Sequence, residues 1–208
     1  MDATLVAVAG VYAANAPRTK AVRTAPASRN VLVNGDFSRG ELRHNWTALY
    51  AGSDAIAGWH VIRPIDYVST TYWQTADATR SIDLDGTPGP GAIAQTFSTV
   101  PGDTYAVRFK IGANTEGPPR VKRVRVTVGG TTRRYSIDVS GRSNAAMHYA
   151  QAAFTFVAPA RTATLTFASL SRPGNWNGAV ITSVVVTDST TTVSSETARA
   201  EFTLQSPR

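Results

Sequence analysis

A two-residue alternation of apolar and polar side chains constrains this chain more than any other feature. The clearest run is Val121–Val128, which places Val124, Val126 and Val128 on one face and Arg123, Arg125 and Thr127 on the other. Because successive side chains of a β-strand point to opposite faces of a sheet, this spacing predicts a strand with one apolar and one polar face. The run ends at Gly129 and Gly130, a pair typical of a two-residue hairpin turn.

Similar runs recur along the chain and are separated by glycine, proline, asparagine and aspartate. Strands are predicted at residues 56–62, 81–85, 92–97, 104–111, 121–128, 132–139, 151–157, 162–167 and 179–187. Residues 158–161 are expected to be a hairpin connection between their two flanking strands. No long segment has a helical period, and turn residues recur about every ten positions, as in sandwiches and barrels. The sequence therefore predicts an all-β domain.

Four segments are expected within the 208 residues. Residues 1–16 look like a truncated signal peptide, because an apolar run is followed by the small-x-small pattern of a cleavage site. An N-terminal extension is the alternative, since no basic residue precedes that run. Residues 17–29 are expected to be a basic linker, residues 30–188 a β-sandwich domain, and residues 189–208 a polar, serine- and threonine-rich tail.

Composition narrows the possible functions. The chain has no cysteine, which excludes disulfides and thiolate metal sites. Lys+Arg number 21 against 14 Asp+Glu, a net charge of +7, which favours acidic partners or simply maintains solubility. No stretch is long enough for a transmembrane segment. No catalytic or phosphate-binding motif occurs, and the three histidines lack metal-ligand spacing. We expect no enzyme activity, no cofactor and no bound metal.

Several short islands occur together in an order that resembles a known family. They are Val31–Phe37, Ile56–Val61, Ile65–Val68, Tyr72–Gly86, Ile93–Phe97, Val100–Tyr105 and Trp176–Gly178. The set resembles the bacterial choice-of-anchor C family, which is related to the plant cell-wall domain of unknown function 642. This resemblance implies an antiparallel β-sandwich, a jelly roll of galactose-binding-like type. It also implies export to the cell surface and association with carbohydrate, pectin in particular for the plant relatives.

A carbohydrate site needs flat rings that face the sugar and polar groups that bind its hydroxyls. The candidates for such a site are Tyr72, Trp73, Gln74, Asp77, Arg80 and Trp176. The two tryptophans fit either a ligand site or packing. Trp59, at the start of an alternating run, is expected in the core.

The predicted hairpin also concentrates arginine. Arg123 and Arg125 face away from the valines, and a two-residue turn places Arg125 opposite Arg134. Like charges directly opposed destabilise a sheet, unless solvent or an anion offsets the repulsion. Guanidinium groups pair bidentately with carboxylates, so uronic acids are a suitable partner; a solvated edge strand is the alternative. The same register places Arg133 on the side of Val126, which a longer loop or a bulge would relieve.

We therefore expect a secreted or cell-surface, non-catalytic carbohydrate-binding module whose ligand is polysaccharide, with acidic, pectin-like polymers favoured. One alternative is a structural envelope or matrix protein that acts through protein–protein contacts. Another is a polysaccharide hydrolase or lyase, although Asp83 and Asp85 are expected to be strand-surface residues or hydrogen-bond partners rather than a catalytic pair. A monomer is expected. No nucleic-acid partner is expected, because aromatic residues do not interleave with the basic run.

The resemblance implies that, in related jelly rolls, carboxylates near the opening and closing strands hold a structural calcium ion. Here Ser38 and Thr182 occupy those positions, although Asp36 could supply one ligand. Calcium requires several oxygen ligands, normally including carboxylates. We predict that added Ca²⁺ leaves the melting temperature nearly unchanged in thermal unfolding; a rise of many degrees would contradict this.

Overall fold

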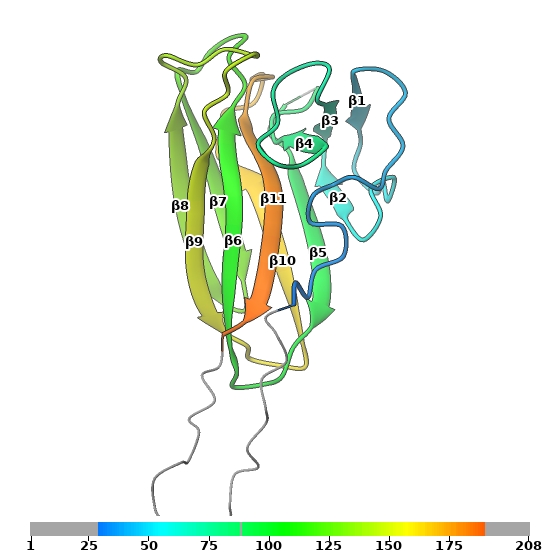
Figure 1. Ribbon diagram of the computed structural model, residues 1–208, viewed down its shortest axis with the longest axis vertical. Coiled ribbons are helices and arrows are strands. Elements are labelled where there is room, and N and C mark those ends of the chain that lie inside the picture. The colour runs from blue at the N-terminus through cyan, green and yellow to red at the C-terminus, as the bar shows by residue number, and fades with distance from the viewer. Residues whose placement is uncertain (1–28, 88, 190–208) are drawn as a thin grey trace, which may run out of the picture. The chain divides into compact units, whose positions relative to one another are not determined.

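The computed structural model describes residues 29–87 and 89–189, which form two antiparallel β-sheets (Figure 1). No helix occurs among these residues, so none has the length and hydrophobicity that a bilayer span requires. The all-β, antiparallel sandwich expected from the sequence is confirmed. The expected signal-like segment, nearly all of the linker, and the tail beyond Ser189 lie outside the described residues.

The two sheets have six and five strands. The six-stranded sheet has the order β1 (Trp46–Leu49), β3 (Ile65–Ser69), β4 (Arg80–Asp83), β11 (Ala179–Asp188), β6 (Thr104–Ala113) and β9 (Ala150–Val157). The five-stranded sheet has the order β2 (His60–Arg63), β5 (Ala92–Ser98), β10 (Thr162–Ser169), β7 (Val121–Val128) and β8 (Thr131–Asp138). Sequence reasoning missed β1 and β3. Strand β3 is largely buried along its whole length, so it shows no two-residue alternation.

The core lies between the sheets and includes Trp59, as expected. This side chain is 1% exposed, and its indole N–H donates to the carbonyl of Asn34 at 3.0 Å. Its ring centroid lies 5.1 Å from that of Phe37 and 6.3 Å from that of Phe167. One buried indole therefore connects the opening segment of the domain to the five-stranded sheet.

The predicted turn between β7 and β8 is confirmed. Val128 pairs with Thr131, and the two glycines between them have φ values of 53° and 79°, a region that favours glycine. Arg133 needs no bulge, because β8 is an edge strand and the guanidinium lies 5.9 Å from the ring of Phe154. The predicted hairpin at residues 158–161 is wrong: β9 pairs with β6, whereas β10 pairs with β5 and β7, so this connection crosses between sheets.

Three charged side chains are buried at one end of the sandwich. Asp83 and Asp85 are 1% and 0% exposed, which corrects the expected strand-surface position, whereas the alternative of a hydrogen-bond partner holds for Asp83. Asp83 accepts hydrogen bonds from the backbone N–H groups of Asp85 and Gly178 at 2.9 Å and from Asn114 Nδ2 at 2.7 Å. Lys122 is also 0% exposed and donates to a backbone carbonyl at 2.7 Å. Its position follows the alternation, which points it inward with the valines of β7.

Burial raises the pKa of Asp83 from 3.8 to about 8, despite opposing hydrogen bonds from Asp85 and Asn114. Burial likewise raises the pKa of Asp66 to about 6. Each folded-state pKa lies above the unfolded value, so the contribution of each protonated carboxyl to the free energy of unfolding is fully present below about pH 4. As the pH rises from there through the folded pKa, this contribution is lost, by up to about 1.4 kcal/mol per pH unit for each group.

We predict that Asp83→Asn flattens the dependence of unfolding free energy on pH between about 4 and 8. At acid pH the variant is less stable by about 1–2 kcal/mol, because its amide nitrogen faces the donor nitrogen of Asn114. At higher pH this gap narrows. Urea unfolding at several pH values measures it, with Asp103→Asn as a matched substitution outside the buried cluster. Parallel curves for all three proteins would contradict a buried, protonated Asp83.

Candidate functional site

Trp73 is a packing residue. It is 3% exposed, its indole N–H donates to Ser81 Oγ at 2.8 Å, and it belongs to a small buried cluster with Val68, Met147 and Val180. A ring enclosed in this way cannot present a face to a sugar. The packing alternative therefore holds, which corrects the expected stacking role of Trp73.

Its neighbours Tyr72 and Gln74 connect loops. The Tyr72 hydroxyl donates to the Glu116 carboxylate at 2.8 Å, and burial together with this carboxylate raises the pKa of Tyr72 to about 12. Gln74 Oε1 accepts from the backbone N–H of Met147 at 2.9 Å, and the Gln74 carbonyl accepts from the Tyr149 hydroxyl at 3.1 Å. These contacts hold the β3–β4 loop against the β6–β7 and β8–β9 loops.

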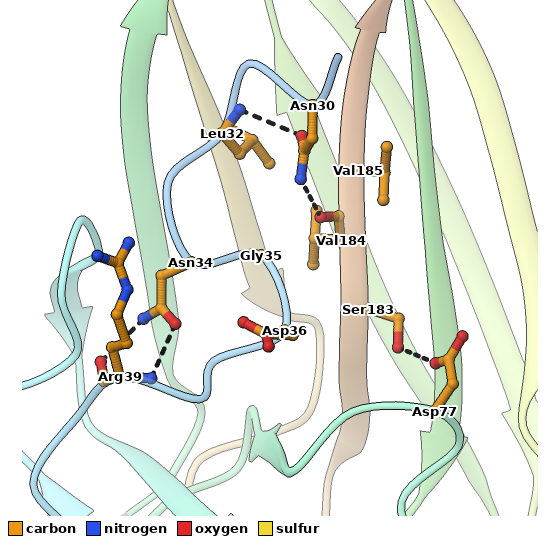
Figure 2. Close-up of a pocket in the computed structure, with 10 residues that line it drawn as sticks. All are labelled: Asn30, Leu32, Asn34, Gly35, Asp36, Arg39, Asp77, Ser183, Val184 and Val185. Carbon is orange, nitrogen blue, oxygen red and sulfur yellow. Dashed lines mark hydrogen bonds between the residues drawn. The ribbon is translucent and has the colours of Figure 1, made fainter. Parts of the chain in front are cut away.

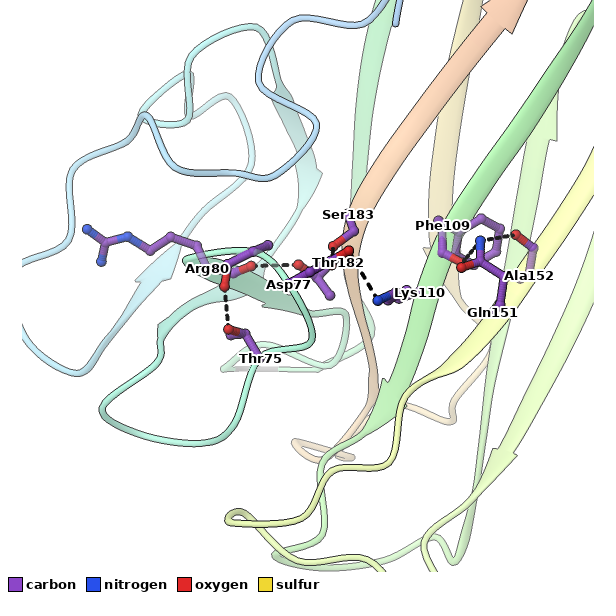
Figure 3. Close-up of polar contacts among 10 residues, drawn as sticks. Thr75, Asp77, Arg80, Phe109, Lys110, Gln151, Ala152, Thr182 and Ser183 are labelled. Atoms are coloured by element: carbon purple, nitrogen blue, oxygen red, sulfur yellow. Dashed lines mark hydrogen bonds and ion pairs between the residues drawn. The ribbon is translucent and has the colours of Figure 1, made fainter.

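Asp77 and Arg80 make different contacts (Figure 3). Asp77 forms an ion pair with Lys110 at 3.1 Å and accepts a hydrogen bond from Ser183, and both contacts lower its pKa. Arg80 lies over the ring of Tyr67 at 5.5 Å. The structure therefore divides the predicted aromatic and polar cluster, because Asp77 contacts β6 and β11 rather than the loops that hold Tyr72.

Asp77 also lines a cleft of about 430 Å³ beside β11 (Figure 2). The other charged residues of this cleft are Asp36 and Arg39. The predicted loss of calcium carboxylates concerns Ser38 and Thr182, which do not line this cleft, although Thr182 directly precedes the lining residue Ser183. Asp36 accepts hydrogen bonds from Ser38, and the Thr182 hydroxyl donates to a backbone carbonyl. Among the described residues no three acidic, histidine or cysteine side chains are grouped to hold a metal ion.

Trp176 is the predicted aromatic residue with an accessible ring. It lies in the β10–β11 loop and is 59% exposed. The next residue, Asn177, packs against Gly117 so closely that a Cβ there would lie 2.7 Å from its amide nitrogen. This contact places the loop that bears Trp176 beside the β6–β7 loop.

The three predicted arginines share the outer face of the five-stranded sheet. Arg125 on β7 pairs directly with Arg134 on β8, as the sequence predicted, and Arg123 precedes Arg125 on the same face. All three side chains are exposed. Within residues 29–87 and 89–189 they have no hydrogen-bonding or ion-pair partner, whereas nearby Arg120 pairs with Asp138 at 2.9 Å. We call Arg123, Arg125 and Arg134 the arginine strip.

A shallow floor continues from the arginine strip across β10 and β5. The pairs that face outward there are Thr162–Ser98, Thr164–Thr96, Thr166–Ala94 and Ala168–Ala92. All are small or hydroxyl-bearing side chains, and the three alanines are at most 6% exposed. Ala168 also pairs with Arg125, so the floor and the strip are adjacent. Sequence reasoning missed this floor, because its partners come from separate parts of the chain.

A groove of about 520 Å³ lies on the same outer face, between β2, β5 and β10. Its lining includes Asp54, His60, Ile62, Thr96 and Thr164. His60 Nδ1 lies 2.8 Å from Asp54 Oδ1, and the two threonine hydroxyl oxygens lie 2.8 Å apart. This face thus combines cations, hydroxyl groups and an oriented imidazole.

Several solved structures resemble this fold at low sequence identity. A CBM4 structure is 17% identical with a TM-score of 0.45 and covers 76% of this chain and 99% of that chain. TmCBM61 in complex with β-1,4-galactotriose is 16% identical with a TM-score of 0.46, and the match covers 77% of this chain and 99% of that chain. A family 35 carbohydrate-binding module from Clostridium thermocellum is 13% identical with a TM-score of 0.44, and the match covers 67% of this chain and 97% of that chain. These likenesses concern the fold alone.

Two sequence comparisons place the chain among known proteins. Halomucin from Haloquadratum walsbyi is 27% identical over 166 residues, which are 77% of this chain but only 2% of halomucin. The model of a family described as "Protein of unknown function (DUF642)" matches residues 30–187. The predicted relation to domain of unknown function 642 is confirmed, whereas the choice-of-anchor C assignment stays a prediction. This chain belongs to the DUF642 family.

Proposed function

We propose that this protein is a non-catalytic carbohydrate-binding module that acts outside the cell or at its surface and binds acidic, pectin-like polysaccharide. The observation that carries the proposal is the arginine strip. Its exposed guanidinium groups have no partners among the described residues, and two of them are directly opposed across β7 and β8. A row of carboxylates on a polymer would offset that repulsion and satisfy the planar donors bidentately.

The surroundings of the strip suit a polymer. The floor beside it is made of alanine, serine and threonine, which places hydroxyl groups next to the guanidinium groups. Strands lie about 4.8 Å apart, so the surface from β5 to β8 is about 14 Å wide. Several sugar rings can lie there without a conformational change in the core.

We predict that replacing the arginine strip with glutamine (R123Q/R125Q/R134Q) weakens binding to polygalacturonate by about tenfold for each arginine lost, because a charge-assisted hydrogen bond contributes about 1.5–3 kcal/mol. Wild-type affinity falls as salt rises, and the variant loses most of that dependence. Affinity electrophoresis and titration calorimetry at low and high salt measure both effects.

The matched control is R43Q/R108Q/R161Q. It removes the same charge, from +7 to +4, at exposed arginines outside the strip. We expect it to bind almost as wild type. Equal losses in both triple variants would mean that net charge alone drives binding. Retention of single-stranded nucleic acid as strongly as polygalacturonate would contradict carbohydrate recognition, and shortening of the polymer would favour a lyase or hydrolase. Failure to bind any glycan would favour a structural matrix protein.

A further inference from the structure

The groove near β2 offers chemistry that the arginine strip lacks. The Asp54 carboxylate can only accept hydrogen bonds, so His60 Nδ1 donates to it at 2.8 Å. In a neutral imidazole this leaves Nε2 as an acceptor, and Nε2 has no partner among the described residues. In the hydroxyl pair Thr96–Thr164 one hydroxyl donates to the other, so the accepting hydroxyl keeps its own hydrogen for a ligand.

One side of the groove is apolar. Ile62 is 45% exposed there, and the short side chain of Ala94 lies opposite His60 in the pairing of β2 with β5. An apolar surface beside uncharged donors and acceptors matches one sugar ring, with its C–H face and its hydroxyls. The groove therefore suits hydroxyl groups, whereas the arginine strip suits carboxylates.

The floor joins the two regions along β10. Thr164 borders the groove, and Ala168, four residues further along the strand, pairs with Arg125. At about 3.3 Å per residue, these positions are about 13 Å apart. A disaccharide is too short to contact both regions, whereas an extended oligosaccharide can reach them.

We infer that one extended polyuronate chain lies along β10, with a sugar ring in the groove and carboxylates on the arginine strip. This inference rests on the proposed function and adds the direction of the chain and a second subsite. The module then recognises internal stretches of an acidic polysaccharide longer than a disaccharide, and affinity increases with chain length until the groove is occupied.

Oligogalacturonides from the disaccharide to the octasaccharide test this by calorimetry. For the wild type we expect affinity to rise with length and then level off. Ala94→Phe places a ring in the groove. We expect this variant to bind the long oligomers about tenfold more weakly than the wild type and to bind the shortest oligomers with unchanged affinity. His60→Ala should also lower the extra affinity that long oligomers have over the shortest ones, without filling the groove. The control Ala153→Phe adds the same ring to the outer face of the other sheet, where Ala153 pairs with Arg108.

The outcomes separate the two proposals. If Ala94→Phe and His60→Ala both bind every oligomer as wild type does, the groove is not a subsite, although the arginine strip still binds polyuronate. If the wild type binds no oligogalacturonide, the proposed function itself is wrong. Thermal unfolding of each variant shows whether the sandwich is intact. A loss that is equal at all lengths in His60→Ala would also overturn the extended path, because it would indicate a site that the disaccharide already fills.

Discussion

The antiparallel pairing of β5, β10, β7 and β8 is the constraint on which the rest of the structure depends. Ile93 on β5, Leu165 on β10 and Val126 on β7 are each 0% exposed and point into the core. The residues that precede and follow each of them along its strand must therefore point outward. A shift of one residue in any pairing would move the buried set to solvent and the outer set into the core. The positions of the arginine strip and the floor are therefore consequences of core packing.

Core packing also explains how two arginines can lie side by side. Repulsion between opposed like charges costs up to about 1 kcal/mol, whereas one fully buried valine contributes about 1.5–3 kcal/mol. Strand β7 buries Val124, Val126 and Val128 against the other sheet. The strand pairing therefore tolerates the opposed guanidinium groups, and their donors stay available to a partner.

At the loop end of the sandwich, the predicted aromatic and polar residues are divided between different contacts. Trp73, within the β3–β4 loop, packs against Val180, while Gln74 contacts Met147, which is 73 residues away in the sequence. Such contacts depend on which loops meet at one end of the fold, and no local pattern reports that. The same holds for Asp77, whose ion pair with Lys110 draws it away from the aromatic residues.

Local sequence patterns were enough to predict the strands that alternate cleanly, the turn at Gly129 and Gly130, the burial of Trp59 and the pairing of Arg125 with Arg134. Each of these follows from the two-residue period and from short-range turn geometry. The folded arrangement of distant segments was needed to show that residues 158–161 cross between sheets, that Asp83 is buried, and that the groove and the arginine strip share one face. These features depend on contacts between distant segments, which the free energy of the whole core selects and a local pattern cannot specify.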